Sequence, residues 1–202
     1  MSENKIKFLS DAQRKQHIDV EQQTGDETYN VFWKGDYNPY RIRKVPINFP
    51  FFNLRNTRTI DTQLEYIKKN NKNDDFFKTL DDEEAQNAQF QIIRDNYIST
   101  TGNQSIVYTN LKNGIQTEPL ILTSDYKVIS GNRRLCIMID LDLTAQEKNQ
   151  ERKFEYIKII LLPKGTEQEE EETAAAAVKT PLEKLMASLA ECQKAIRQIE
   201  DE

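Results

Sequence analysis

Two short apolar runs lie within residues 119–138. A glycine follows them directly, and after it the apolar residues recur at helical spacing. The runs at 119–123 and 126–130 are rich in strand formers and lie close together, so they predict a hairpin or two nearly adjacent strands. Gly131 then allows a sharp junction between strand and helix, because glycine adopts backbone conformations that a Cβ disfavours. The spacing of apolar residues over 135–143 predicts the helix that follows.

Alternating strand and helix signals elsewhere in the chain favour a mixed α/β or an α+β fold. Strand formers at 29–33 and 154–162 predict two further strands, and residues 40–49 predict an extended segment interrupted by Pro46. Short strands and helices alternating within 202 residues therefore predict one compact body of mixed α/β or α+β class.

Helices are expected between these strands. Thr62 and Glu65 form a capping box, so a helix should begin near Thr62. A longer helix is predicted over 80–98, where four acids at its start suit the positive end of the helix dipole. A short helix after Ile106 should end at Gly114, since glycine commonly closes helix C-termini.

The two ends of the chain are polar. Residues 1–28 are interpreted as a mobile arm or a short docking helix, and residues 29–165 as the folded domain, with a helical insertion at about 62–113. Residues 166–179 read as an acidic and alanine-rich linker, followed by an amphipathic helix over 180–202. Its apolar seam is Leu182, Leu185, Leu189, Cys192, Ile196 and Ile199. The helix either packs back on the domain or binds a second copy or another partner.

Charge and composition exclude several function classes. The net charge is −5, but ten Asp and Glu against four Lys and Arg lie within 167–202, so the rest of the chain is close to neutral. A local phosphate-facing surface is compatible with that balance, whereas a strongly basic one is not. Cys136 and Cys192 cannot build a disulfide framework, and His17 alone supports neither a histidine-rich metal site nor a triad.

No apolar run approaches the length of a membrane span, about 18 residues, and residues 1–23 lack the apolar middle of a secretory signal. We therefore expect a cytoplasmic protein without a membrane partner.

The segment Gly131-Asn132-Arg133-Arg134 is the best candidate for a chemical site. The glycine permits a tight turn, the N–H groups that follow open a helix whose positive end attracts anions, and arginine forks match phosphate oxygens. These features predict a phosphate site. The alternative is that both arginines only pair with the chain's many acids.

Residues 114–138 resemble the ParB/sulfiredoxin-like domain, whose hallmark is a first strand preceded by Gly and Pro, a turn, a second strand and Gly-x-[RH]-Arg opening a helix. Residues 45–58 also look like that family's leading segment, an extended strand running into an Asn- and Arg-rich loop. The resemblance covers roughly residues 45–162. It implies an α+β fold, in which a small mixed sheet is flanked by helices. It also implies a nucleotide site for CTP or ATP, with Mg²⁺, at the strand-to-helix glycine.

The resemblance also implies site residues, although it gives no catalytic residue and no metal ligand. Asn56 and Arg58 would close the pocket from a loop that follows a strand expected to pair beside residues 126–130. The implied nucleotide and phosphate residues are Gly131, Asn132, Arg133, Arg134, Gly114, Thr117, Glu118, Asn56 and Arg58.

Two departures from the family limit the expected activity. Asn132 stands where sulfiredoxins carry the reactive cysteine and where segregation ParB proteins usually carry Glu, so sulfiredoxin activity is not expected. Pro163 and the acidic run after it occupy the place of the ParB Glu-Asn-x-x-Arg motif, which argues against CTP hydrolysis of the segregation type.

The leading hypothesis is a ParB-like, nucleotide-binding and DNA-associated domain of a bacterial, phage or plasmid system, such as a defence component. The resemblance allows NTPase or nuclease activity. The alternative is a non-catalytic interaction module that oligomerises or recruits a partner through residues 180–202.

Overall fold

The computed structural model describes residues 5–21, 27–33, 36–100 and 105–164. These residues form a mixed five-stranded sheet with flanking helices, which confirms the predicted α+β class. The strands run in the order β1-β2-β5-β3-β4, and every neighbouring pair is antiparallel except β3 and β5. Their bounds are β1 (Thr28–Trp33), β2 (Asp36–Pro46), β3 (Leu120–Leu122), β4 (Val128–Ser130) and β5 (Tyr156–Leu161). The predicted hairpin is thus confirmed as β3 and β4.

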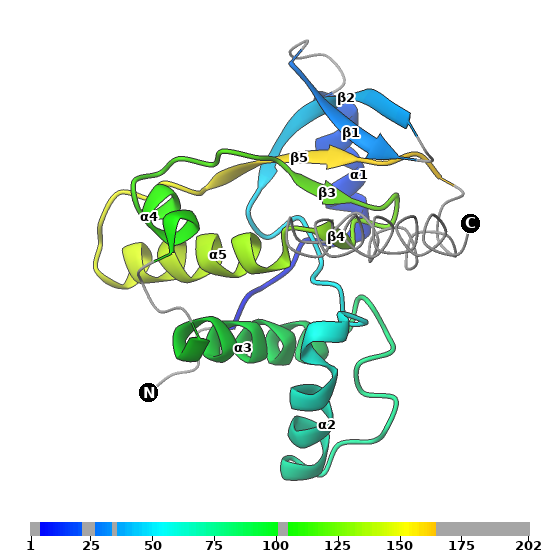
Figure 1. Cartoon of the computed structure of the whole chain (residues 1–202), viewed down its shortest axis with the longest axis vertical. Coiled ribbons are helices and arrows are strands. Elements are labelled where there is room, and N and C mark those ends of the chain that lie inside the picture. The colour runs from blue at the N-terminus through cyan, green and yellow to red at the C-terminus, as the bar shows by residue number, and fades with distance from the viewer. Residues whose placement is uncertain (1–4, 22–26, 34–35, 101–104, 165–202) are drawn as a thin grey trace, which may run out of the picture.

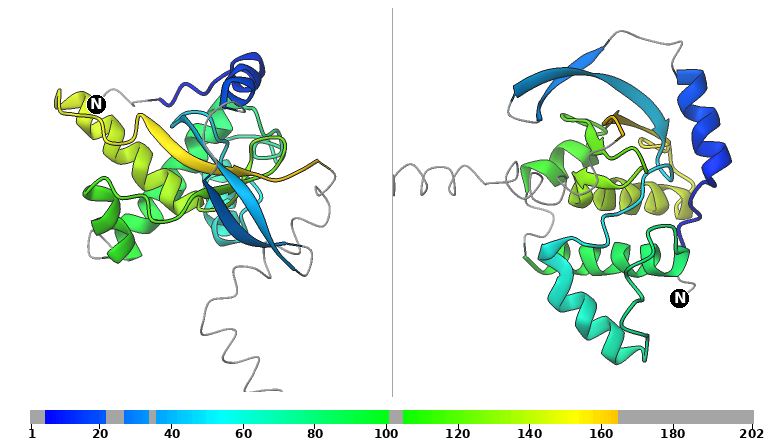
Figure 2. Two further views of the ribbon diagram at one scale, coloured as in Figure 1. Left: turned by 90° about the horizontal axis from the view of Figure 1, so that it is seen from above. Right: turned by 90° about the vertical axis from the view of Figure 1, so that its right-hand side faces the viewer.

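The helices stack beneath and beside the sheet (Figures 1 and 2). From the sheet downward in Figure 1 come α5, then α3, and α2 projects furthest, while α1 runs along one side. The bounds are α1 (Asp11–Glu21), the 3-10 turn η1 (Thr57–Thr59), α2 (Ile60–Lys69), α3 (Glu83–Thr100), α4 (Ile106–Lys112) and α5 (Asn132–Glu147). No helix within the described ranges is long and apolar enough to cross a membrane.

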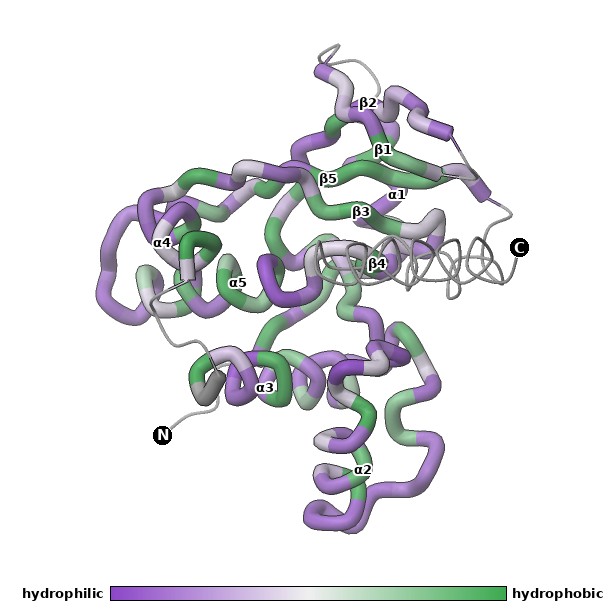
Figure 3. The backbone as a smooth tube through the Cα atoms, viewed as in Figure 1, coloured by the Kyte–Doolittle hydropathy of each residue, from purple (hydrophilic) through white to green (hydrophobic). Residues whose placement is uncertain are grey.

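Helix α5 is the centre of the core because it lies between the sheet and α3. Five consecutive residues, from Leu135 to Ile139, are at most 3% exposed, so the helix is buried on both sides. Leu120 and Ile159 of the sheet belong to the same apolar cluster, as does Phe90 of α3. Figure 3 shows how strongly hydrophobic β3 and β5 are. A second apolar cluster joins the β1–β2 hairpin to β5 and contains Val31, Trp33 and Ile160.

The helix boundaries show why one predicted cap is wrong. Helix α2 begins at Ile60, so Thr62 lies inside it and caps nothing. The start is earlier because Asn56 Oδ1 accepts a hydrogen bond from the Arg58 N–H at 3.2 Å and thereby opens η1. Helix α3 likewise begins at Glu83, where Asp82 accepts from the Ala85 N–H at 3.0 Å.

The C-terminal cap of α4 follows its sequence signal. Gly114 has a φ of +80°, its N–H donates to Leu111 O at 2.8 Å, and the Ile115 N–H donates to Asn110 O at 2.9 Å. This pair of bonds is a Schellman motif, in which glycine avoids the strain of the left-handed backbone.

The strand before the loop formed by residues 50–59 pairs differently from the prediction. That strand is β2, which lies between β1 and β5 rather than beside β4. The loop reaches the β3–β4 hairpin through one isolated parallel bridge, in which Phe51 lies opposite Lys127. The expected pairing is therefore wrong for the strand, although the loop itself does come to the hairpin.

The two chain ends differ in what the structure describes. Residues 11–21 form α1, in keeping with the docking-helix interpretation, and Arg14 of this helix is only 1% exposed. The predicted linker over 166–179 and the apolar seam over 180–202 lie outside the described residues.

Candidate nucleotide-phosphate site at the start of α5

The junction between β4 and α5 requires glycine. Gly131 has a φ of +108°, and a Cβ at this position would lie 2.5 Å from Leu120 Cδ2. Gly131 is also the N-cap of α5 and offers no side chain to accept from the first N–H groups. The positive end of the helix is therefore left without a side-chain cap, as an anion site requires.

Asn132 connects three segments instead of projecting freely. Its Oδ1 accepts from the Asn53 N–H at 2.9 Å, and its Nδ2 donates to Val128 O at 3.0 Å. Both ends of the amide are thus used, so Asn132 holds the loop 50–59 against the hairpin at the first residue of α5. A ligand role for this side chain would require these bonds to break.

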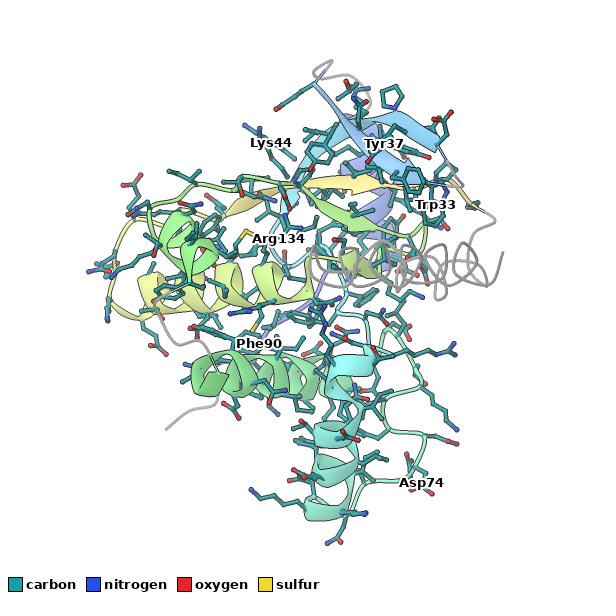
Figure 4. All side chains as sticks on the ribbon, viewed as in Figure 1. Trp33, Tyr37, Lys44, Asp74, Phe90 and Arg134 are labelled. Atoms are coloured by element: carbon teal, nitrogen blue, oxygen red, sulfur yellow. The ribbon has the colours of Figure 1, made fainter. Side chains whose placement is uncertain are left out.

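Arg134 is mostly buried, with 17% of its side chain exposed, and lies between the sheet and α5 (Figure 4). Its Nη1 donates to Glu118 O at 3.0 Å and forms an ion pair with Glu118 Oε2 at 3.0 Å. Burial lowers the pKa of Arg134, while the neighbouring Glu118 and Tyr29 raise it. Arg134 therefore holds the segment that leads into β3, because its guanidinium bonds the backbone and side-chain oxygens of Glu118.

Arg133 has a different environment from its neighbour. It lies in the first turn of α5, beside the uncapped N-terminus, and it is exposed, whereas Gly131, Asn132 and Arg134 are half-buried. Of the four residues in the predicted phosphate motif, Arg133 is the side chain placed to meet a ligand from solvent.

The loop 50–59 carries the other predicted residues toward this region. Asn56 is half-buried and Arg58 is exposed, and the loop reaches α5 through the Asn53–Asn132 hydrogen bond. Arg58 and Arg133 are both exposed, on the two segments that this hydrogen bond joins.

Glutamines of α2 and α3 support this loop, and sequence analysis missed them. The fully buried amide of Gln86 accepts from the Phe52 N–H at 2.8 Å and donates to Phe52 O at 3.1 Å. Gln63 Nε2 donates to Leu54 O at 2.8 Å and to Gln89 Oε1 at 2.7 Å. These side chains pair with the loop backbone as a neighbouring strand would, so the predicted insertion acts as the loop's support.

Arg14 is a second support that sequence analysis missed. Its Nε donates to Phe49 O at 2.7 Å, and its guanidinium carbon lies 3.8 Å from the centre of the Phe51 ring. The Tyr126 ring lies 5.9 Å away on the hairpin. Helix α1 is thereby anchored where the loop and the hairpin meet, through a buried cation and two aromatic rings.

Gly114 and Thr117 are not joined to the start of α5 by any hydrogen bond or ion pair that involves the described residues. Gly114 serves the cap of α4, and a Cβ there would meet Lys153 Cδ at 3.3 Å. Thr117 is exposed, whereas its neighbour Gln116 accepts from the Lys158 N–H and donates to Lys158 O, each at 2.7 Å. Only Glu118 of this segment reaches the motif, through Arg134.

Two further features limit the chemistry. The described ranges contain no group of three or more His, Cys, Asp and Glu that could hold a metal ion. A cleft of about 420 Å³ lies at the other end of α5, beside Asp142 and Arg152, and none of the predicted site residues lines it.

No protein-family model matches the chain, and no curated protein or solved structure is significantly similar to it.

Proposed function

We propose that the chain binds the phosphate groups of a nucleotide, CTP or ATP, at the start of α5. The observation that carries the proposal is the uncapped N-terminus at Gly131, with the exposed Arg133 in the same helical turn. Such a helix end attracts phosphate because its N–H groups and dipole favour negative charge, and an arginine adds charge-assisted bonds.

The four motif residues then have separate roles. Gly131 lets the backbone approach the ligand, and Arg133 pairs with phosphate oxygens. Asn132 and Arg134 position the surrounding segments through their bonds to Asn53 and Glu118. Arg58 adds charge from the facing loop, and Mg²⁺ arrives with the nucleotide, since it is usually held largely by phosphates and water.

The ParB/sulfiredoxin-like resemblance extends this proposal to a DNA-associated protein of a bacterial, phage or plasmid system, with NTPase or nuclease activity. Its support is the order of the sequence motifs, together with a sheet in which β4 leads through glycine into α5 and β5 returns parallel to β3. Binding of the nucleotide is the elementary step, and it is testable by itself.

The test is a titration of the full chain with CTP, ATP, GTP and ADP in the presence of Mg²⁺, followed by thermal unfolding and calorimetry. A nucleotide at 100 times its dissociation constant should stabilise the fold by about 2.7 kcal/mol. Arg133→Ala should weaken binding about tenfold or more, because it removes charge-assisted bonds. The matched control is Lys148→Ala, which removes a charge at the opposite end of α5 and should leave binding unchanged.

The second candidate function is the non-catalytic interaction module. The observation that favours it is that Asn132 and Arg134 use their polar groups within the protein. Absence of any stabilisation by the four nucleotides would reject nucleotide binding and support this alternative.

A further inference from the structure

Strand β1 forms one edge of the sheet, and half of its backbone groups point outward. The Ile42 N–H donates to Glu27 O at 2.8 Å, and Thr28 lies opposite Arg41. Because the direction of the backbone groups alternates along an antiparallel strand, Tyr29, Val31 and Trp33 also face β2. The N–H and C=O groups of Thr28, Asn30 and Phe32 consequently face away from the sheet. No described residue hydrogen-bonds to them.

This edge lacks the features that usually prevent strands from pairing between molecules. The six residues from Thr28 to Trp33 include no charge, no proline and no glycine, and their pairing with β2 has no bulge. Natural sheets protect their edges with such features because an open edge is a template for another strand. The opposite edge, β4, is only three residues long and is bridged by Phe51. The unprotected edge is therefore β1.

The three residues whose backbone groups face away from β2 are also accessible to solvent. Thr28 and Asn30 are exposed, and Phe32 is 47% exposed although its ring lies 5.1 Å from that of Tyr37. All three side chains project on the same face of the sheet, because they are alternate residues of one strand. A strand added to this edge would cover Phe32.

We propose that β1 pairs antiparallel with β1 of a second copy of this chain, about a two-fold axis at Asn30. The outward residues are symmetric about Asn30, so one axis places Asn30 opposite Asn30 of the partner subunit and Thr28 opposite Phe32 of the partner subunit. Each outward N–H and C=O then obtains a partner. The two five-stranded sheets become one continuous sheet.

The chemistry of the strand favours a second copy as the occupant. An isologous contact requires a self-complementary patch, and the absence of charge means that no like charges meet across the axis. The Phe32 ring meets a β-branched threonine, which is a favourable cross-strand combination. The two Asn30 amides face each other and can exchange hydrogen bonds.

The first experiment is cysteine cross-linking of the full chain, with Cys192 replaced by serine to remove a competing thiol. In Asn30→Cys, a hydrogen-bonded pair on the axis has Cα atoms about 5.5 Å apart, which suits a disulfide. The matched variant is Tyr37→Cys, at a position that is 69% exposed on β2. Its copy in the dimer lies three strand spacings across the sheet and four residues along it, about 20 Å away.

Mild oxidation should link Asn30→Cys into a dimer and leave Tyr37→Cys monomeric. Absence of cross-linking in both, or equal cross-linking in both, would overturn the proposal.

The second experiment is sedimentation of Asn30→Pro across a range of concentrations. Proline at this position removes an N–H that the monomer does not use, so the fold should be retained and dimerisation should weaken at least tenfold. The control is Tyr29→Pro, which removes an N–H that faces β2 and should disturb the hairpin in the circular dichroism spectrum. Unchanged dimerisation of a folded Asn30→Pro variant would also overturn the proposal.

Discussion

The start of α5 and the loop 50–59 touch through one hydrogen bond, from the Asn53 N–H to Asn132, yet they are built in different ways. The start of α5 is made by neighbours in the sequence, because the β3–β4 hairpin leads through Gly131 directly into the helix. The loop is held by side chains from distant positions, chiefly Gln86 and Arg14.

The difference shows two ways in which the backbone near a site can be held in place. At the start of α5, the conformation of one glycine determines the geometry. In the loop, side-chain amides make the backbone hydrogen bonds that a neighbouring strand would otherwise make. Asn87 does the same elsewhere, because it bonds both the N–H and the C=O of Ile6. A glycine junction between adjacent elements can be recognised in the sequence, whereas a side-chain amide that bonds a distant segment cannot.

The largest effect should come from Gly131→Ala. The substitution forces a left-handed backbone on alanine and brings its Cβ against Leu120, so we expect a loss of about 4 kcal/mol in unfolding free energy. The control is Gly114→Ala, whose Cβ meets only the flexible Lys153 side chain and should cost about 1 kcal/mol. Urea unfolding measures both, and equal losses would mean that the β4–α5 junction is not specially constrained.

Gln86→Ala tests the loop in the same way. It leaves the N–H and C=O of the buried Phe52 without their partner, so we expect a loss of about 3 kcal/mol. Gln91→Ala, on the same helix and less buried, should change stability by less than about 0.5 kcal/mol. Hydrogen exchange at Phe52 should accelerate only in the Gln86 variant. An unchanged exchange rate would show that the loop does not depend on this amide.

These two variants also separate what the sequence could predict from what it could not. The hairpin, the Gly131 junction and the Gly114 cap were predictable, because each depends on residue types within a few positions of one another. Gln86 was not predictable, since a glutamine within a helix gives no sign that it is buried against a loop 34 residues away.

Arg14 was missed for the same reason, as an arginine in a polar segment normally lies at the surface. The predicted motif does open a helix, because Gly131 is the N-cap of α5. The different environments of Arg133 and Arg134 depend on the position of Glu118 in the fold.

Alanine variants of the two arginines should differ in their effect on the free energy of unfolding. Arg134→Ala removes the bonds to Glu118 and to the backbone before β3, so we expect a loss of about 2 kcal/mol in stability. Arg133→Ala should change stability by less than about 0.5 kcal/mol, because its side chain is exposed. Thermal unfolding of both variants without nucleotide measures the contrast. Equal losses would contradict the division between a positioning arginine and a surface arginine.

The smallest effect distinguishes the predicted helix start from the observed one. If Thr62 capped a helix, Thr62→Ala would cost about 1 kcal/mol. Because Thr62 lies within α2, we expect instead no loss, or a gain of up to about 0.5 kcal/mol from the better helix propensity of alanine. Asn56→Ala should cost about 1 kcal/mol, since it removes the acceptor that opens η1. Urea unfolding of the two variants should therefore differ in sign or clearly in size, and a loss confined to Thr62→Ala would place the helix start where the capping box predicted it.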